Sequence, residues 1–430
     1  MSIRNFLFGV MLRASLLVGA ILILPGDCFS QDTVKKVPDG TEGETLNAKG
    51  NTFAKNKAWN EFNLGFTTFK IGLGFLYEYG GFSQDATGKQ QMDLAKVTLS
   101  NGFDVRDSRL LFGGQLNTKR LITWKAGFMY DGSERAWYVR ESGVLIAVPE
   151  LWGSFFVGRT KEGISMSKVM NGYSGEGLER AMVLDPIPIL ADGVKWLGYL
   201  EKPRIFWNAG VFTDWLSKGQ SFSTYTWQVV ARVGWLPIHD DKSNLHIAAS
   251  FRIGHPLSDS IRVRSRPEAN NAPFFIDAGK FPTDQSTYTG GEVYYSTGSW
   301  WFGSEFYWDS FRSPTKDNPV FFGGDLMASY VLTGESRPYM TTGAIYGFVP
   351  VKRSVFKGGP GAWEVVLRYS TFDLNSGLIN GGKFWRITPV VNWYLSANFR
   401  LALAYGYGVL DRYDLKGATN FFQSRLQVMF

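Results

Sequence analysis

Apolar and polar or small residues alternate with a period of two through most of this chain. In residues 69–79 every odd position is large and apolar, whereas most even positions are glycine or charged. Residues 398–408 repeat the pattern, with Phe, Leu and Tyr at odd positions and mostly Arg, Ala and Gly at even positions. Strand side chains alternate between two faces, whereas helical side chains recur about every 3.6 residues. The stripe therefore predicts an all-β chain.

Composition limits how such strands are arranged. The chain has 16% aromatic residues and 49 glycines, and aromatic residues favour strands whereas glycine weakens helices. Beyond its first residues, the chain has no stretch approaching the roughly eighteen apolar residues of a membrane-spanning helix. Only helices and closed barrels satisfy every backbone polar group in lipid. Because Tyr and Trp gather at segment ends, like an aromatic girdle, we predict a transmembrane antiparallel β-barrel.

The alternating segments are separated by clusters of Gly, Asn, Asp, Ser and Pro, which favour turns. Seventeen such segments can be marked, namely 59–79, 103–116, 120–131, 137–148, 151–159, 204–215, 225–236, 245–255, 274–280, 287–296, 300–310, 321–332, 340–349, 362–372, 384–394, 399–409 and 421–430. Bacterial single-chain barrels have an even number of strands. Since 274–280 is the weakest segment, we predict about 16 strands, with 18 as the alternative. Such a lumen is wide enough for water.

The N-terminal region divides into two parts that precede the barrel. Residues 1–30 resemble an export signal, with Arg4 and Arg13 before a short apolar run. Residues 31–58 are polar and rich in Gly, Lys and Thr, which indicates a flexible periplasmic segment. The barrel is expected to span 59–430. Export signal and barrel together predict an integral protein of the outer membrane of a Gram-negative bacterium.

Residues that could carry chemistry are scarce. Cys28 is the only cysteine and lies in the export signal, so the mature chain is expected to have no disulfide or thiolate site. The three histidines, His239, His246 and His255, lack the spacing of a metalloprotease or a serine hydrolase. The formal charge of +7 comes from dispersed basic residues, which argues against a nucleic-acid-binding module. We therefore predict no enzyme, no cofactor and no nucleic-acid partner.

Loop lengths predict a topology. Short turns at 149–150 and 395–398 are typical of the periplasmic side of a barrel. Residues 160–203 form a long insertion with weak alternation, and a loop of this length is a candidate to fold inward and narrow the lumen. The chain ends on Phe430, and a last alternating strand with a terminal aromatic residue resembles the signal read by the barrel-assembly machinery.

Several stretches resemble one family. Residues 329–339 (SYVLTGESRPY), 361–370 (GAWEVVLRYS) and 392–395 (NWYL) are similar to the C-terminal half of the phosphate-selective porin O and P family. Residues 105–110 (VRDSRL), 158–163 (GRTKEG) and 264–268 (RSRPE) fit the same family. The resemblance implies a sixteen-stranded, trimeric diffusion channel, general or anion-preferring, without chemistry of its own. Residues 31–56 lack the heptads of some relatives, so a trimer would form through the barrel walls.

Charged side chains that line a lumen set the selectivity of a pore. Alternation places one set of basic residues on the lumen face of their strands: Lys70, Arg368, Arg386, Arg400 and Arg425. Arg262, Arg264 and Arg266 alternate within one segment, which either lines the channel or is an outer loop. In the long insertion, Lys161, Lys168 and Arg180 are candidates for a constriction, accompanied by Lys195. The carboxylates that could pair with the basic residues are Glu78, Glu364, Glu162, Glu176, Glu179, Asp185 and Asp192.

These observations predict a porin for passive diffusion of small hydrophilic solutes, including inorganic anions such as phosphate. The arginines either attract anions or are paired with the carboxylates, and the two readings stay open. The alternatives are a plugged barrel that serves as an adhesin or structural anchor, and an outer-membrane hydrolase, for which no catalytic constellation is recognisable. Expected partners are outer-membrane lipid, two further copies of the chain and the assembly machinery.

Overall fold

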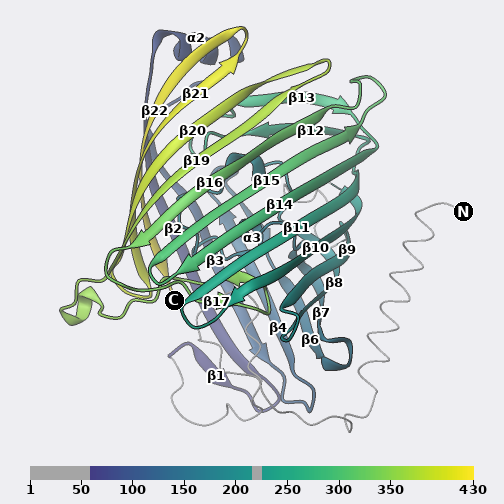
Figure 1. Ribbon diagram of the computed structural model, residues 1–430, viewed down its shortest axis with the longest axis vertical. Helices are drawn as coiled ribbons and strands as arrows, with labels where there is room; N and C mark the ends of the chain where they lie inside the picture. The colour runs from purple at the N-terminus through teal and green to yellow at the C-terminus, as the bar shows by residue number, and fades with distance from the viewer. Residues whose placement is uncertain (1–58, 216–224) are drawn as a thin grey trace, which may run out of the picture.

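A closed antiparallel barrel encloses most of the chain (Figure 1). The computed structural model describes residues 59–215 and 225–430, so the predicted export signal and periplasmic segment lie outside the described residues. Sixteen wall strands follow one another around the barrel. They are β2 (Thr68–Gln84), β3 (Gly102–Gln115), β4 (Ile122–Asp131), β5 (Ala136–Val139) continued by β6 (Ser142–Val148), β7 (Gly153–Lys161), β8 (Leu190–Leu200), β9 (Ile205–Thr213), β10 (Tyr225–His239), β11 (Ser243–Pro256), β14 (Gln285–Thr297), β15 (Trp300–Arg312), β16 (Val320–Val331), β19 (Ala362–Ser376), β20 (Ile379–Tyr394), β21 (Phe399–Arg412) and β22 (Leu415–Met429).

The last strand closes the barrel on the first. β22 pairs with β2 from Met429 opposite Gly74 to Thr419 opposite Gln84, so neither strand has a free edge over this stretch. Below it, the short strand β1 (Glu61–Asn63) pairs with the start of β2. Closure satisfies the backbone groups that lipid cannot. The predicted transmembrane barrel of sixteen strands is confirmed.

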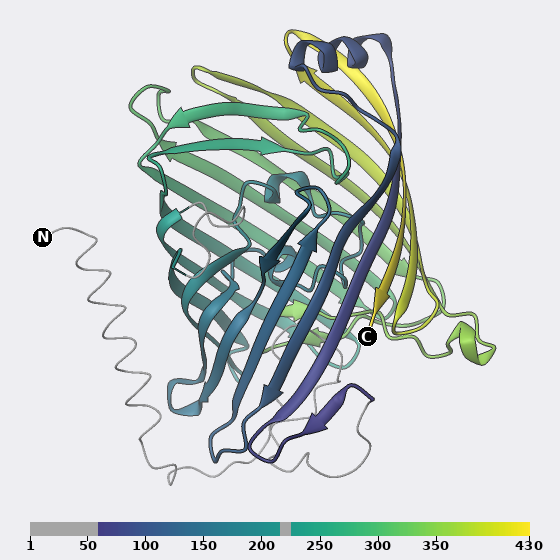
Figure 2. The ribbon, with the colours of Figure 1, turned by 180° about the vertical axis from the view of Figure 1, so that it is seen from behind.

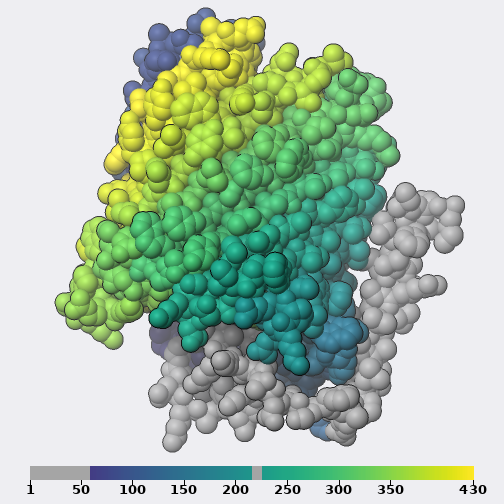
Figure 3. Space-filling model, viewed as in Figure 1, coloured from purple at the N-terminus to yellow at the C-terminus, as the bar shows by residue number. Residues whose placement is uncertain are grey.

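The two faces of each wall strand differ as the alternation requires. On β21, Leu403 and Tyr405 are each 52% exposed toward the outside, whereas Ala402 and Ala404 are 2% and 3% exposed on the lumen side. The outer wall is continuous in the space-filling view (Figure 3). At the start of β19 and the end of β20, Trp363 stacks on Trp393 with 4.9 Å between ring centroids. Such pairs form an aromatic girdle at the membrane interface.

Two of the seventeen marked segments lie outside the wall, one of them the segment 274–280 that the even strand number had set aside, and one wall strand lies where a loop was expected. Residues 274–280 belong to a hairpin of β12 (Ser260–Ser265) and β13 (Ile276–Pro282), and residues 340–349 contain only the short pair β17 (Tyr339–Met340) and β18 (Ile345–Tyr346). Neither is part of the wall, because an inward hairpin with one packed face has the same period as a wall strand. Conversely, β8 is a wall strand that lies within the expected loop 160–203. It was not predicted because its apolar pattern is interrupted by Asp192, Gly193, Lys195 and Gly198.

Three connecting segments fold into the lumen (Figure 2). Residues 162–189 follow β7 and contain α3 (Met166–Val169) and η2 (Met182–Leu184), and residues 257–284 contain the β12–β13 hairpin. The segment 332–361 starts at the opposite, periplasmic end; its part with β17 and β18 enters the lumen, whereas η3 (Val355–Lys357) lies outside the wall. Apolar residues of the first two segments, Val183, Val263 and Phe275, pack in one cluster with Phe321 and Phe384 of the wall. The first two segments thus narrow the lumen from the side of the wall that contains β16 and β20.

Two of the helical elements, α2 and η1, lie at the rims of the barrel. α2 (Ala86–Ala95) lies on the extracellular rim, where the Gln91 side-chain amide donates to the carbonyls of Leu410, Arg412 and Leu415. η1 (Pro149–Leu151) forms a short periplasmic turn. Within 59–215 and 225–430, none of the helices has the length and apolar character needed to cross a membrane.

Candidate functional site

The inward segment 162–189 is held at its start by acidic residues of the wall. Ser165 caps α3 by accepting from the Lys168 amide at 3.0 Å. The Met166 amide donates to Glu292 at 2.7 Å and the Ser167 amide to Glu305 at 2.8 Å. These carboxylates project from β14 and β15 and are buried. Free amides at a helix start favour negative charge, so the acidic side of the wall is occupied in fixing the loop.

Arginines of β21, of β22 and of the periplasmic segment hold the middle of the same segment. The Arg400 guanidinium donates to the Gly175 carbonyl at 2.7 Å, and Arg425 donates to the Leu178 carbonyl. Arg337, from the periplasmic segment 332–361, donates to the Ser174 carbonyl at 2.7 Å. A guanidinium offers several donors in a fixed plane, which suits it to bind loop carbonyls. The loop is therefore clamped across the lumen from two sides.

The predicted lumen arginines do lie on the inner face, and each is engaged. Arg368 forms an ion pair with Glu268 at 2.6 Å, and Arg425 pairs with Glu78 and Glu179. Arg386 donates to Gln423 at 2.6 Å and to the carbonyls of residues 267 and 268. Glu364 is bound by Arg337 rather than by one of the predicted residues. These arginines hold inward loops to the wall.

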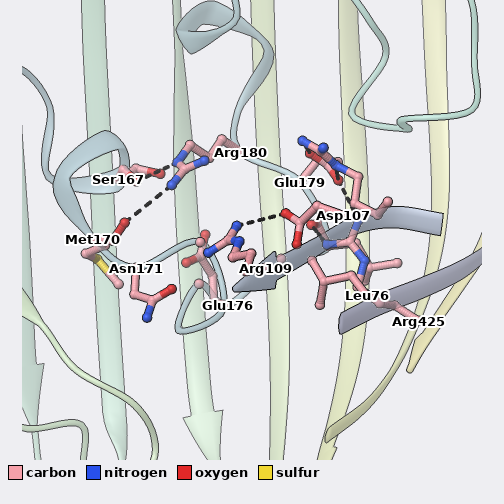
Figure 4. Close-up of a pocket in the computed structure, with 15 residues that line it drawn as sticks. Leu76, Asp107, Arg109, Ser167, Met170, Asn171, Glu176, Glu179, Arg180 and Arg425 are labelled. Atoms are coloured by element: carbon pink, nitrogen blue, oxygen red, sulfur yellow. Dashed lines mark hydrogen bonds and ion pairs between the residues drawn. The ribbon is translucent and has the colours of Figure 1, made fainter. Parts of the chain in front are cut away.

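A cavity opens where the tip of the segment 162–189 faces β2, β3 and β22 (Figure 4). Its charged lining consists of Arg106, Asp107, Arg109, Glu176, Glu179, Arg180 and Arg425. A register shift between Leu76 and Tyr77 of β2 makes Arg106 the extra residue of a bulge on β3. A bulge re-aims side chains, and it brings both Arg106 and Asp107 to this cavity.

The carboxylates of this cavity are bound by neighbouring groups. Glu179 accepts from Arg106 Nε at 2.8 Å, and Asp107 accepts from Arg109 at 2.8 Å and from the Tyr173 hydroxyl at 2.6 Å. Burial opposes the ionisation of Glu179, but Arg106 and Arg425 outweigh it and hold the pKa of Glu179 well below its usual value. The Arg109 guanidinium also stacks over the Tyr173 ring at 4.1 Å.

Lys168 and Arg180 of the loop differ from the paired arginines described above. Within the described residues, neither forms an ion pair with a carboxylate. Arg180 donates only to the carbonyls of Ser167, at 2.6 Å, and Met170. Burial lowers the pKa of Arg180 to about 10, so this guanidinium stays charged at neutral pH. Burial and the neighbouring Arg180 lower the pKa of Lys168 to about 7. Arg180 lies beside Arg109 at this cavity (Figure 4), and the positive charges of Arg109 and Arg106 also lower its pKa.

The remaining predicted residues lie elsewhere. Arg262, Arg264 and Arg266 occupy the face of the β12 segment opposite the buried Val263, inside the extracellular mouth. Arg262 pairs with Asp277, and Arg264 and Arg266 stack on Phe274 at 3.8 and 4.2 Å. Lys161 Nζ donates to the Met170 carbonyl at 2.7 Å, and Lys70 pairs with Glu61 at the periplasmic rim. No metal-binding group of His, Cys, Asp or Glu is found in the described ranges.

Comparison with known proteins decides the family. The model of the family described as phosphate-selective porin O and P matches residues 69–430, which is nearly the whole described barrel. The chain belongs to this family. The porin is also 31% identical over 183 residues to an uncharacterized protein of Caulobacter vibrioides, a match that covers 41% of the porin and 36% of that protein.

Solved structures share the fold of this porin at low identity. An anion-selective porin from Comamonas acidovorans is 12% identical, with a TM-score of 0.52 over 85% of the porin and 100% of that chain. The trimer form of OmpT, an outer membrane protein of Vibrio cholerae, is 12% identical, with a TM-score of 0.53 over 85% and 99%. DcaP, an outer membrane channel of Acinetobacter baumannii, is 9% identical, with a TM-score of 0.51 over 86% and 99%. The porin is thus an outer-membrane barrel.

Sequence reasoning missed three residues of the cavity and its support, Arg106, Arg109 and Arg337. All three stand in stretches that carried the family resemblance, yet only alternation was used to choose lumen residues. The adjacent charges Arg106 and Asp107 break alternation within β3, and this break is the signal of the bulge. Arg337 lies in a connecting segment, where alternation gives no information.

Proposed function

We propose that this porin is an anion-selective channel for small hydrophilic solutes, with phosphate among them, and that its selectivity is set beside the loop 162–189. The observation that carries the proposal is the lack of a bound carboxylate at Lys168 and Arg180. The neighbouring acidic groups are already bound, Glu179 by Arg106 and Arg425 and Asp107 by Arg109. A passing anion therefore meets uncompensated positive charge at this level of the lumen.

The basic row of the β12 segment supports the same direction of selectivity. Arg262, Arg264 and Arg266 lie inside the extracellular mouth, on the face that is not packed against the wall. Stacking on Phe274 keeps Arg264 and Arg266 extended without neutralising them. Positive charge in a mouth with low-dielectric walls raises the local concentration of anions. Arg262 is neutralised by Asp277, so we assign Arg264 and Arg266 of this row to anion capture and the loop to discrimination.

Passage requires binding that is favourable but weak. An anion exchanges part of its hydration shell for guanidinium and ammonium donors, and leaves again because the Arg180 guanidinium also keeps the carbonyls of Ser167 and Met170 as partners. A guanidinium offers paired N–H groups that match a phosphate or a carboxylate, whereas an ammonium acts as a point charge. Arg180 and Lys168 thus supply one group of each kind.

Phosphate block of chloride current tests this assignment. In planar bilayers, low phosphate is expected to reduce chloride current through the wild-type porin, and Arg180→Met is expected to weaken the block about tenfold. Lys416→Gln, on the exposed β21–β22 hairpin, removes the same charge far from the loop and serves as the control. An equal block in all three proteins would remove the loop from the account. The absence of ion-permeable steps would support a plugged barrel instead.

We also propose a homotrimer formed through the barrel walls, exported by the signal 1–30 and inserted by the assembly machinery through Phe430. The trimer form of the related Vibrio cholerae structure supports the assembly state. Native mass spectrometry of detergent-purified porin is expected to give three times the mass of the mature chain. A monomer mass under the same conditions would contradict the trimer.

A further inference from the structure

The end of the periplasmic segment 332–361 leaves the lumen and lies on the outer surface of the barrel. Phe356 packs edge-on against Phe399, with 5.4 Å between centroids. The Pro360 carbonyl accepts hydrogen bonds from the indole N–H groups of Trp363, at 3.2 Å, and Trp393, at 3.0 Å. These three aromatic side chains face outward, because their chain neighbours on the same strands face the lumen. η3 projects beyond the wall at the lower left of Figure 1.

This projection has a defined shape. The Val355 amide donates to the Leu395 carbonyl at 2.8 Å, which ties the segment to the adjacent periplasmic turn. Ser354 caps η3 by accepting from the Phe356 amide at 3.3 Å, and the Gly361 amide donates back to the Arg353 carbonyl at 3.0 Å. Gly358 ends the turn with a positive φ of 76°, a conformation that glycine adopts without strain. The exposed side chains are therefore presented on a fixed backbone.

The side chains presented are basic and aromatic. Lys352, Arg353 and Lys357 are exposed, and Phe356 is 65% exposed. Lys352 Nζ donates to the Gly334 carbonyl at 2.8 Å, and none of the three cations forms an ion pair within the described residues. From Ser336 to Trp363 the sequence contains no Asp or Glu. We call Lys352, Arg353, Phe356 and Lys357 the basic ridge.

The basic ridge lies at the depth of lipid headgroups. The Trp363–Trp393 stack and the Phe399–Phe430 pair, with centroids 5.9 Å apart, belong to the aromatic girdle of the periplasmic end. Aromatic girdles of outer-membrane barrels sit at the membrane interface, where headgroups meet acyl chains. Since Phe356 and Pro360 contact this girdle directly, the three cations are level with the phosphates of the periplasmic leaflet.

We propose that the basic ridge binds the headgroups of anionic phospholipids in the periplasmic leaflet. Lys352, Arg353 and Lys357 bind the phosphate oxygens, and Phe356 enters the interface beside the girdle. Clusters of Lys and Arg near a membrane surface attract anionic lipid, and Arg adds paired donors for phosphate. The ridge cannot serve the pore mouth, because it is on the outside of the wall. The binding holds the periplasmic end of β19–β21 against the membrane.

Native mass spectrometry tests the lipid preference. Intact porin in detergent is titrated with phosphatidylglycerol or with phosphatidylcholine of the same acyl chains, and the ratio of bound lipid is read for each protein. Arg353→Gln/Lys357→Gln leaves the hydrogen bond of Lys352 in place and is expected to lower the preference for phosphatidylglycerol at least threefold. The control Lys89→Gln/Lys416→Gln removes two exposed charges at the extracellular end and is expected to keep the preference.

An unchanged ratio in the ridge variant, or an equal loss in the control, would overturn the proposal. The second result would mean that net charge alone governs lipid binding. Heat-modifiable migration on a gel verifies that each variant is a folded barrel. If the double variant does not fold, Lys357→Gln alone is judged by the same ratio. Selectivity of the pore is read separately, so failure of either proposal leaves the other standing.

Discussion

Single cations differ in this lumen according to whether a carboxylate binds them. Most inward arginines of the wall, such as Arg368 and Arg425, are neutralised by Glu268, Glu78 and Glu179. A buried ion pair contributes little net stability, but a buried charge without its partner is costly. Lys168 and Arg180 have no such partner within the described residues, and burial lowers the pKa of each. We propose that residues of this second kind select solutes.

Lys168 makes the selectivity depend on pH. Because its pKa is about 7, the ammonium is charged below that pH and neutral above it. The charges that act on it are Arg180, which favours the neutral form, and Asp185, Glu162 and Glu305, which favour the charged form. We expect anion preference to be stronger at pH 5.5 than at pH 8.5, measured as reversal potential in a salt gradient. Lys168→Met should lose most of this change, and a full change in the variant would rule Lys168 out as the titrating group.

Arg337 is predicted to be essential for stability. Its guanidinium donates to both carboxylate oxygens of Glu364, at 2.9 and 3.0 Å, and also to the Ser174 and Gly347 carbonyls. Only 2% of the Arg337 side chain is exposed. Arg337→Met leaves Glu364 buried without its countercharge, so the free energy of unfolding should fall by about 3–5 kcal/mol. Urea unfolding in lipid vesicles measures the change. Arg337→Met/Glu364→Gln should cost less than Arg337→Met alone, and a greater loss would contradict this reason.

At the scale of elements, the loop 162–189 owes its position to contacts with both sides of the wall. Glu292 and Glu305 bind the start of α3, and Arg400 binds the carbonyl of Gly175. These groups come from β14, β15 and β21, and Glu179 further along the loop is bound by Arg106 of β3, on the far side of the barrel from β14, so the loop acts as a strut across the lumen. Its closed position depends on the few charged groups at each end.

Removing the contacts of Arg400 with the loop should make the current through the pore fluctuate. Arg400→Met removes the donors to the Gly175 and Glu176 carbonyls and leaves the contacts of α3 intact. We expect single-channel current with frequent larger substates, since the tip of the loop can then leave the cavity. Lys383→Met, an exposed residue on β20, is the matched control. Steady wild-type current in the Arg400 variant would show that the other contacts suffice.

The sequence predicts wall strands well and inward segments poorly, for a physical reason. A wall strand has lipid on one face, so its alternation is regular, as in β21 and β22. β8 lacks the pattern because polar residues and glycines interrupt it, and the β12–β13 hairpin shows the pattern because one face packs inside. The predicted number of strands was right: of the seventeen marked segments, 274–280 and 340–349 are not wall strands, and β8 is a wall strand that was not marked.

The candidate site was predictable in part. Alternation found Arg400 and Arg425, and loop length pointed to Lys168 and Arg180. Whether a cation is paired depends on contacts between distant segments, such as Arg368 with Glu268 across 100 residues, which no local pattern contains. The bulge at Arg106 depends on the register with β2, and its one local signal, the break in alternation at Arg106 and Asp107, was not used.

For the whole molecule, fold and charge distribution have separate origins. The outer face is set by lipid and closure, which fixes a barrel like those of other outer-membrane porins. The inner face uses many of its charges to hold three inward segments, and we propose that the small cationic remainder, rather than the formal charge of +7, determines the solute. A porin of this design changes its solute by altering few residues, without altering the wall.

The reversal potential of the wild-type porin in a potassium chloride gradient tests this account most directly. Purified protein is inserted into a planar bilayer at pH 6 with a tenfold gradient, and the zero-current potential is read. We predict that the reversal potential has the sign given by chloride permeation. Its magnitude should be clearly larger than that of the Arg180→Met variant. A potential of the opposite sign, given by potassium permeation, would contradict the central claim that uncompensated positive charge at the loop 162–189 selects anions.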